Sequence, residues 1–314
     1  MTRQPQSFHD FIYQLRDACR TDDVAAVANL VAIASSKSDL SFKAQDVLDR
    51  GLRYTPLNNA IKVLSYLVEQ GADVNSLQGW QLVSGADGKL PSRELLEFLL
   101  AQGWDVNSGE PSFYRAPLLW KITEDHELVK WCLDHGASVH LPHSDSEDDR
   151  AMRRPILLIA TRYGNLSTFE LLRSRGAPLC PEILPEAVTM CIRAAPAVGE
   201  TPDECFQDRM NFIRHLIDVV GIDVNTNAVY PGSSRATPLC RIACLPKNDP
   251  KELIWLLLDY GADPNRGGAP GAPSFATSAF EGAKLFRNTR FIKAVEEWQA
   301  KHPAGAGFPS GPST

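Results

Sequence analysis

One phrase recurs along the chain: an apolar helical run, then Gly, then often Ala-Asp-Val-Asn. It occurs six times, and its glycines are Gly71, Gly103, Gly136, Gly176, Gly221 and Gly261. Successive glycines stand 32, 33, 40, 45 and 40 residues apart, which indicates a unit of about 33 residues with insertions in the later copies. A repeat of this length constrains the chain to an array in which each unit packs on its neighbours.

The glycines mark the ends of helices. Each follows a run with helical periodicity, where a residue in the left-handed conformation commonly stops a helix. Any side chain with a Cβ costs roughly 1–2 kcal/mol in that conformation. Thr237 and Pro238 suit the cap and the first turn of another helix, and Ala243 permits close helix packing. We therefore predict two helices per unit, the second of which ends at the glycine.

These features resemble the ankyrin repeat. Residues 237–239 (TPL) are similar to the TPLH start of that repeat, and residues 163–166 (YGNL) are similar to its turn between helices. The usual His of TPLH is replaced by Asn58 and by Cys240. The resemblance implies an all-α solenoid of about eight helix pairs with β-hairpin fingers, which binds another protein through its concave and finger face.

The resemblance extends over residues 1–302. A degenerate N-terminal repeat is expected at about 7–35 and a capping repeat at about 275–300, because arrays need polar ends. The Gly-, Pro- and Ser-rich tail at 303–314 is predicted to be disordered. Thr55 lies only 16 residues before Gly71, which is short for the family pattern. We therefore predict that Thr55 caps a long second helix and that residues 44–53 form the first.

Composition excludes several classes of partner. With 32 Lys and Arg against 38 Asp and Glu, the net charge of -6 disfavours nucleic acid and anionic lipid. The longest apolar runs, such as 155–160 and 253–258, are far shorter than the roughly 20 residues that cross a bilayer, and the start lacks a signal-peptide core. Seven scattered cysteines are typical of reduced thiols. We expect a monomer in the cytoplasm or nucleus, with no membrane partner.

No motif in the sequence indicates catalysis, a cofactor or a metal. GxSxG, HExxH, P-loop and GxGxxG patterns are absent. Cys132 stands three residues before His135, a spacing that could bring a thiol and an imidazole together. Because other repeats have Leu at the position of Cys132, we interpret Cys132 as a core residue. Cys240 and Cys244 lack the further ligands that a structural zinc needs. We predict that the chain is not an enzyme. The alternative is an enzyme whose site lies in the insertion at 194–208, which contains Cys205.

Three aromatic residues are the best candidates for contact with a partner. Trp80 follows the finger that begins at Asn75, while Phe113 and Tyr114 follow the finger that begins at Asn107. Repeats of this type present finger side chains to partners, and large aromatic side chains supply much binding energy at low entropic cost. We expect these residues to project from adjacent fingers as one aromatic patch, or else to fold back onto the first helices.

Trp255 is a fourth candidate for partner binding. It stands six residues before its glycine, where four other repeats have polar residues: Ser65, Glu97, Lys130 and Glu170. The alternative is that Trp255 is covered by the loop at 266–274 or by the C-terminal helices.

The acidic tract at 145–149 (DSEDD) is either a docking or phosphorylation site or a solvated loop. The predicted function is a protein-interaction scaffold; a substrate-recognition adaptor of a larger complex is the alternative.

Overall fold

A computed structural model describes residues 8–36, 43–83, 89–110, 112, 114–141, 154–193, 196, 199–228, 237–245, 251–267 and 278–302. The chain divides into two compact units, Met1–Arg154 (the first unit) and Pro155–Thr314 (the second unit). In the described ranges every regular element is a helix and no β-strand occurs. The fold class is therefore all-α, as predicted. The prediction of β-hairpin fingers is wrong for the described connections, which are built from turns and 3-10 helices.

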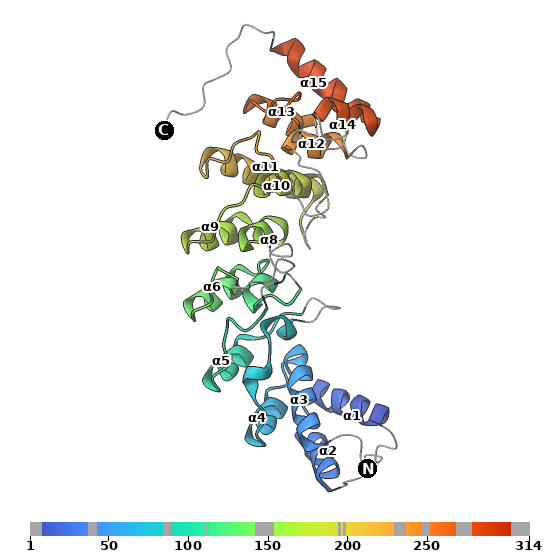
Figure 1. Ribbon diagram of the computed structural model, residues 1–314, viewed down its shortest axis with the longest axis vertical. Coiled ribbons are helices and arrows are strands. Elements are labelled where there is room, and N and C mark those ends of the chain that lie inside the picture. Colours follow the sequence, from blue (N-terminus) through green and yellow to red (C-terminus); the bar gives the residue numbers. More distant parts are fainter. Residues whose placement is uncertain are drawn as a thin grey trace. The chain divides into compact units, whose positions relative to one another are not determined.

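The first unit contains two complete helix pairs followed by two shortened ones (Figure 1). The complete pairs are α1 (Phe8–Arg20) with α2 (Val24–Ser36), and α3 (Ala44–Tyr54) with α4 (Ile61–Glu69). In the shortened pairs a single 3-10 turn precedes the second helix: η3 (Gly79–Leu82) before α5 (Arg93–Ala101), and η4 (Leu118–Lys121) before α6 (His126–Asp134). Two further 3-10 turns are η1 (Pro56–Asn58) and η2 (Val74–Ser76).

The second unit contains four complete pairs. They are α8 (Ile156–Tyr163) with α9 (Leu166–Ser174), α10 (Ile183–Arg193) with α11 (Pro202–Asp218), α12 (Pro238–Ala243) with α13 (Lys251–Asp259), and α14 (Ala279–Leu285) with α15 (Thr289–Lys301). The first helices α8, α10, α12 and α14 pack against one another in chain order (Figure 1). The helix pairs of the two units are the repeated helix pairs that the recurring phrase predicts.

The six repeat glycines are helix stops, as predicted. Their φ angles lie between +77° and +96°, in the left-handed region. At Gly176 the backbone closes the helix end with bonds from its own N–H to the Arg173 carbonyl and from the Ala177 N–H to the Leu172 carbonyl. A Cβ added at Gly176 would meet no other atom within 4 Å. The need for glycine there is therefore a matter of backbone conformation and not of space.

Asparagine side chains join one repeat to the next. Asn225 Nδ2 donates to the Gly261 carbonyl at 3.0 Å, and Asn225 Oδ1 accepts from the Asp263 N–H at 2.8 Å. Asn107 makes the same pair of bonds in the first unit, to the Gly136 carbonyl at 3.1 Å and the Ser138 N–H at 2.7 Å. Each such asparagine bridge therefore satisfies backbone groups just past the helix end of the following repeat.

The prediction that Thr55 caps a long second helix is wrong. Thr55 ends α3, and its hydroxyl donates to the Leu52 carbonyl at 3.1 Å. The chain then turns at Asn59, whose φ of 52° is left-handed, and α4 begins only at Ile61. Asn tolerates this conformation better than most residues, which is why the turn forms here without glycine.

The second half of the insertion at 194–208 is helical and forms the start of α11 at Pro202. Thr201 Oγ1 accepts from the Glu204 N–H at 3.2 Å, while the Thr201 N–H donates to Glu204 Oε2 at 2.8 Å. This reciprocal capping box fixes the helix start.

Several predicted features lie outside the described residues. They are Phe113, the acidic tract at 145–149, most of the loop at 266–274 and the tail at 303–314. None of the described helices is both long and apolar enough to cross a bilayer.

We predict that Gly176→Val lowers the free energy of unfolding by about 1–2 kcal/mol or more, because a β-branched residue is forced into the left-handed region. Urea titration followed by circular dichroism measures the change. Gly164, whose φ of -87° any residue adopts, provides the matched position, and Gly164→Ala should cost less. Equal unfolding free energies for wild type and Gly176→Val would contradict the assigned helix ends.

Candidate functional site

The two described aromatic candidates of the first unit share one pocket. This pocket, of about 440 Å³, is called the aromatic pocket. Its lining residues are Arg53, Leu57, Trp80, Gln81, Val83, Tyr114 and Lys121. The structure thus brings Trp80 and Tyr114 together. Trp80, however, lies in η3, in the place of a first helix, and not on the connection between repeats.

The aromatic pocket lies where the first helices of two repeats are reduced to single turns. Its residues come from the end of α3, from η1, from η3 and from the segment that leads through Tyr114 into η4. Pro117 stands 19 residues before Gly136, whereas Pro155, which precedes the complete helix α8, stands 21 residues before Gly176. Because proline fixes the start of the first helix, two fewer residues remain to build it.

Close backbone approach holds these turns together. A Cβ at Gly79 would lie 2.2 Å from the Leu118 nitrogen, so only glycine permits η3 to approach η4 this closely. The Gly79 N–H donates to the Ser108 carbonyl at 2.9 Å. Trp104, which is 3% exposed, donates from Nε1 to the Leu77 carbonyl at 2.9 Å. This second bond joins the same two segments, the one that follows Gly71 and the one that follows Gly103. The position of Trp80 is therefore set by backbone contacts on both sides.

The pocket surface combines carbon with positive charge. Trp80 is half-buried, and its Nε1 is buried with no hydrogen-bond partner among the described residues, so the accessible part of the indole is carbon. Tyr114 is 71% exposed. Lys121 is half-buried, and burial lowers the pKa of its ammonium group. Arg53 is exposed at the pocket margin.

Trp255 is engaged inside the second unit. Its Nε1 donates to the Ala294 carbonyl in α15 at 2.9 Å. The Nζ atoms of Lys251 and Lys301 lie 4.7 and 4.4 Å from its ring centroid, within the range of cation–π attraction. The C-terminal helix α15 therefore covers part of Trp255, which is one of the alternatives considered from the sequence. This contact accounts for a Trp at a position that is polar in other repeats.

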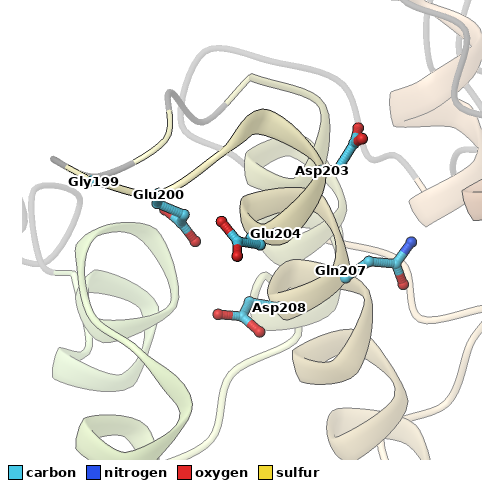
Figure 2. A pocket seen from close by; sticks show the side chains of 6 residues that line it. All are labelled: Gly199, Glu200, Asp203, Glu204, Gln207 and Asp208. Carbon is cyan, nitrogen blue, oxygen red and sulfur yellow. The ribbon is translucent and has the colours of Figure 1, made fainter.

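A second hollow, of about 740 Å³, lies at the start of α11 in the second unit. Figure 2 shows its lining residues Gly199, Glu200, Asp203, Glu204, Gln207 and Asp208. Glu200, Glu204 and Asp208 lie on one side of the helix, while Asp203 and Gln207 lie on the other. Glu204 is used in the capping box, and its bonds to Thr201 lower its pKa. No group of three potential ligands in the described residues is arranged to hold a metal ion.

The thiols lack the environment of nucleophiles. Burial, together with the nearby Glu200 carboxylate, raises the pKa of Cys205. Cys132 is fully buried, and its pKa is raised to about 12 by burial and by Asp125. Because the thiolate is the reactive form, both side chains stay protonated at neutral pH. His135 is bonded through Nδ1 to the Trp131 carbonyl of its own helix at 2.7 Å, and Cys132 is core as predicted.

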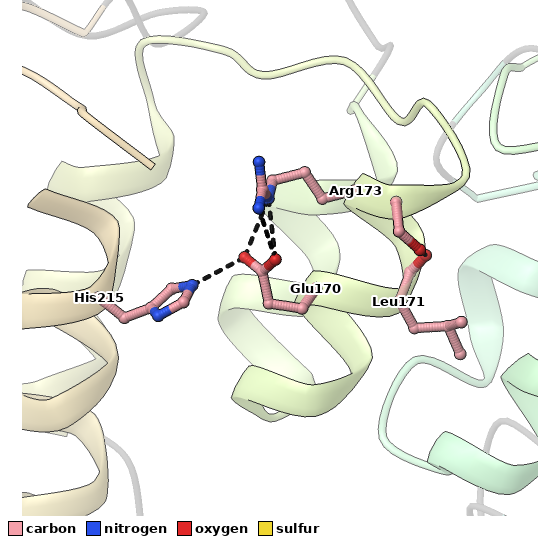
Figure 3. Close-up of polar contacts among 5 residues, drawn as sticks. Glu170, Leu171, Arg173 and His215 are labelled. Atoms are coloured by element: carbon pink, nitrogen blue, oxygen red, sulfur yellow. Dashed lines mark hydrogen bonds and ion pairs between the residues drawn. The ribbon is translucent and has the colours of Figure 1, made fainter. Parts of the chain in front are cut away.

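A polar cluster joins the second helices α9 and α11. Glu170 and His215 occupy equivalent positions, each six residues before its repeat glycine. Glu170 Oε1 lies 2.8 Å from His215 Nε2, and Arg173 donates to both carboxylate oxygens at 2.7 to 3.0 Å (Figure 3). The bonds from Arg173, followed by that from His215, lower the pKa of Glu170. With both oxygens engaged, Glu170 acts as a structural link between repeats.

Similarity to known proteins is found among solved structures alone of the three comparisons. A scan against protein-family models finds no match, and a search of curated proteins finds none either. Among solved structures, the chain is similar to the crystal structure of the human ASB11 ankyrin repeat domain, with 19% sequence identity. The match covers 87% of this chain and 96% of that chain, at a TM-score of 0.36. The fold assignment rests on the helix pairs, left-handed glycines and asparagine bridges of this chain itself.

We predict that the Glu170 cluster stabilises the fold in a pH-dependent way. The folded pKa of Glu170 lies below its ordinary value of 4.5, so the stabilisation is present above that value and is lost as pH falls through the folded pKa. At pH 7, Glu170→Gln should lower the free energy of unfolding by up to about 1 kcal/mol, and at pH 3 by less.

The control is Glu97→Gln. Glu97 holds the equivalent position on α5, where it is exposed and forms no hydrogen bond within the described ranges. Its substitution should change stability by less than about 0.5 kcal/mol at both pH values. A loss from Glu170→Gln that is the same at pH 7 and pH 3 would show that its carboxylate charge is not the cause.

Proposed function

We propose that this chain is a protein-binding module that engages its partner through the aromatic pocket of the first unit. The observation that carries the proposal is the convergence of Trp80 and Tyr114 on one pocket whose surface is mainly carbon. Aromatic side chains of this kind dominate the binding energy of protein interfaces. The remaining repeats serve as a frame that holds the pocket in place.

Exposure of Tyr114 supports this assignment. A tyrosine that is 71% exposed presents a large apolar surface that a partner can bury. Trp80 presents carbon to the same pocket, and the two side chains together offer an anchor site surrounded by polar residues. This arrangement, an apolar centre with a polar rim, is that of a typical interface hot spot.

Phe113 is part of the same proposal because it precedes Tyr114 in the sequence. Trp255 is a weaker candidate, since its indole is bonded to α15. The adaptor function, in which a second surface would attach to a larger complex, remains a finer version of the same proposal. Catalysis in the insertion is less favoured because burial suppresses the Cys205 thiolate.

The experiment is quantitative capture of partners by immobilised full-length protein, with mass spectrometry as the readout. Trp80→Ala and Tyr114→Ala should each lose a common set of partners that wild type retains, since truncating a hot spot weakens binding by about 2 kcal/mol, or roughly thirtyfold. Unfolding free energies are measured in parallel. Tyr114→Ala should stay within about 0.5 kcal/mol of wild type because it removes an exposed side chain.

The matched control is Tyr163→Ala, which removes a tyrosine that is 50% exposed in the second unit. It should capture the same partners as wild type. If Trp80→Ala and Tyr114→Ala fold normally and lose no partner that Tyr163→Ala keeps, the aromatic pocket is not the binding site.

A further inference from the structure

We propose that Trp80 is the hydrogen-bond donor of the aromatic pocket: on binding, its side chain turns so that Nε1 donates to a main-chain carbonyl of the partner protein. This inference rests on the proposed function and adds the polar contact by which the pocket recognises its partner. It starts from a buried N–H group that the folded chain leaves unpaired.

The indole N–H of Trp80 lacks an acceptor in the part of the chain that the structure describes. Nε1 is buried and unpaired, although the side chain as a whole is only half-buried. In Trp104, a buried tryptophan of the same unit, Nε1 donates to the Leu77 carbonyl at 2.9 Å. Trp120, also buried, donates to the Arg154 carbonyl at 2.9 Å. Because a buried N–H without an acceptor destabilises the folded state, the N–H of Trp80 does not contribute to folding.

Two further polar atoms beside Trp80 are also unpaired. Gln78 Oε1 and Ser108 Oγ are buried and lack hydrogen-bond partners among the described residues. Gln78 stands directly before η3, and the Ser108 carbonyl accepts from the Gly79 N–H of that turn. Native proteins leave few buried polar atoms unpaired, so the hydrogen bonding around this turn is incomplete in the free chain. Of the three unpaired groups, the Trp80 donor belongs to a residue that lines the pocket.

The backbone of Trp80 is fixed, so its side chain is the part that moves. A Cβ at Gly79, the preceding residue, would lie 2.2 Å from the Leu118 nitrogen, which shows how closely the two turns are packed. The pocket of about 440 Å³ lies against the indole and gives it space to turn between staggered rotamers. Turning brings Nε1 from the buried edge of the ring to the pocket. The bond formed there has no counterpart in the free chain, so it adds to the affinity for the partner.

The other lining residues favour a main-chain carbonyl as the acceptor. Leu57 and Val83 are half-buried and, with the carbon of the indole, form a surface that one apolar side chain of the partner can cover. A backbone carbonyl stands beside every side chain, so a single stretch of the partner supplies both contacts. Gln81 Oε1, an acceptor within the lining, already accepts from the Gln78 N–H at 2.8 Å. We therefore expect an apolar side chain whose neighbouring carbonyl faces Trp80.

The experiment removes the N–H group and keeps the size of the ring. Full-length protein carries benzothienylalanine at position 80, in which sulfur replaces the indole N–H. The probe is a peptide from a random library displayed on phage, selected on wild type and depleted on Trp80→Ala. It should bind the benzothienyl variant about tenfold more weakly than wild type, because one hydrogen bond of the complex is lost. The urea midpoint of unfolding should stay the same or rise, because no bond is lost in the free chain.

Two matched variants carry the same analogue at other tryptophan positions. At position 298 in the second unit, where Trp298 Nε1 donates to Asp259 Oδ1 at 2.7 Å, the analogue should leave peptide affinity unchanged. At position 104 it removes the bond from Trp104 to the Leu77 carbonyl and should lower the urea midpoint. If the variant at position 80 is destabilised as strongly as the variant at position 104, the Trp80 N–H is paired in the free chain and the inference is overturned.

Peptide affinity separates this inference from the proposed function. If the benzothienyl variant at position 80 binds the peptide as wild type does, while Trp80→Ala does not, the pocket binds through carbon alone and only the inference fails. If Ala replacement of one polar side chain in the peptide abolishes the difference between wild type and this variant, that side chain is the acceptor, which overturns the main-chain contact. If no peptide that depends on Trp80 is recovered, the proposed function fails as well.

Discussion

The left-handed glycine that ends a repeat is the constraint on which the array depends, and at two junctions an asparagine bridge joins that helix end to the previous repeat. A helix that ends at a left-handed glycine leaves backbone groups without helical partners, and Asn225 and Asn107 bond to such groups in the following repeat. Each bond contributes about 0.5–1.5 kcal/mol, and leaving the same groups unpaired costs more. The bridge therefore links the helix end of one repeat to the connection of the previous one.

The region of greatest functional interest is where this regularity breaks down. Just before the bridged junction of the first unit, Trp104 replaces the usual Ala after the repeat glycine, and its indole bonds to the Leu77 carbonyl. The first helices there are reduced to η3 and η4, and Gly79 lets the two turns touch through their backbones. A shortened first helix leaves room for a pocket, while the intact neighbouring repeats keep its walls in position. Loss of repeat regularity and formation of the aromatic pocket are thus one structural event.

Local signals in the sequence predicted the frame well. The helix stops at the glycines and the cap at Thr237, whose hydroxyl accepts from the Cys240 N–H, depend on a few neighbouring residues and can be read directly. The error at Thr55 arose because Asn59 takes the left-handed conformation that was expected only of glycine. The helical start of α11 was signalled by the TPDE sequence at 201–204, a capping-box pattern that outweighs the surrounding prolines.

The aromatic pocket was only half predictable. Trp80 and Tyr114 stand out because large aromatic residues follow the repeat connections. The contributions of Arg53 and Lys121 depend on how far the first helices are shortened, which is a property of packing between repeats and not of any local pattern. The spacing of Pro117 from Gly136 was the one signal available, since it leaves two residues fewer than the complete repeat has.

The claim that asparagine bridges couple the repeats is tested most directly by comparing the unfolding free energies of Asn225→Ala and Asn265→Ala. In both residues the backbone N–H donates to the side chain of the Asp two positions earlier, and this bond survives substitution by Ala. The exposed Asn265 side chain, unlike that of Asn225, forms no bridge within the described ranges. The account predicts that Asn225→Ala lowers the free energy of unfolding by about 1–3 kcal/mol and Asn265→Ala by less than about 0.5 kcal/mol. Equal effects of the two substitutions would contradict it.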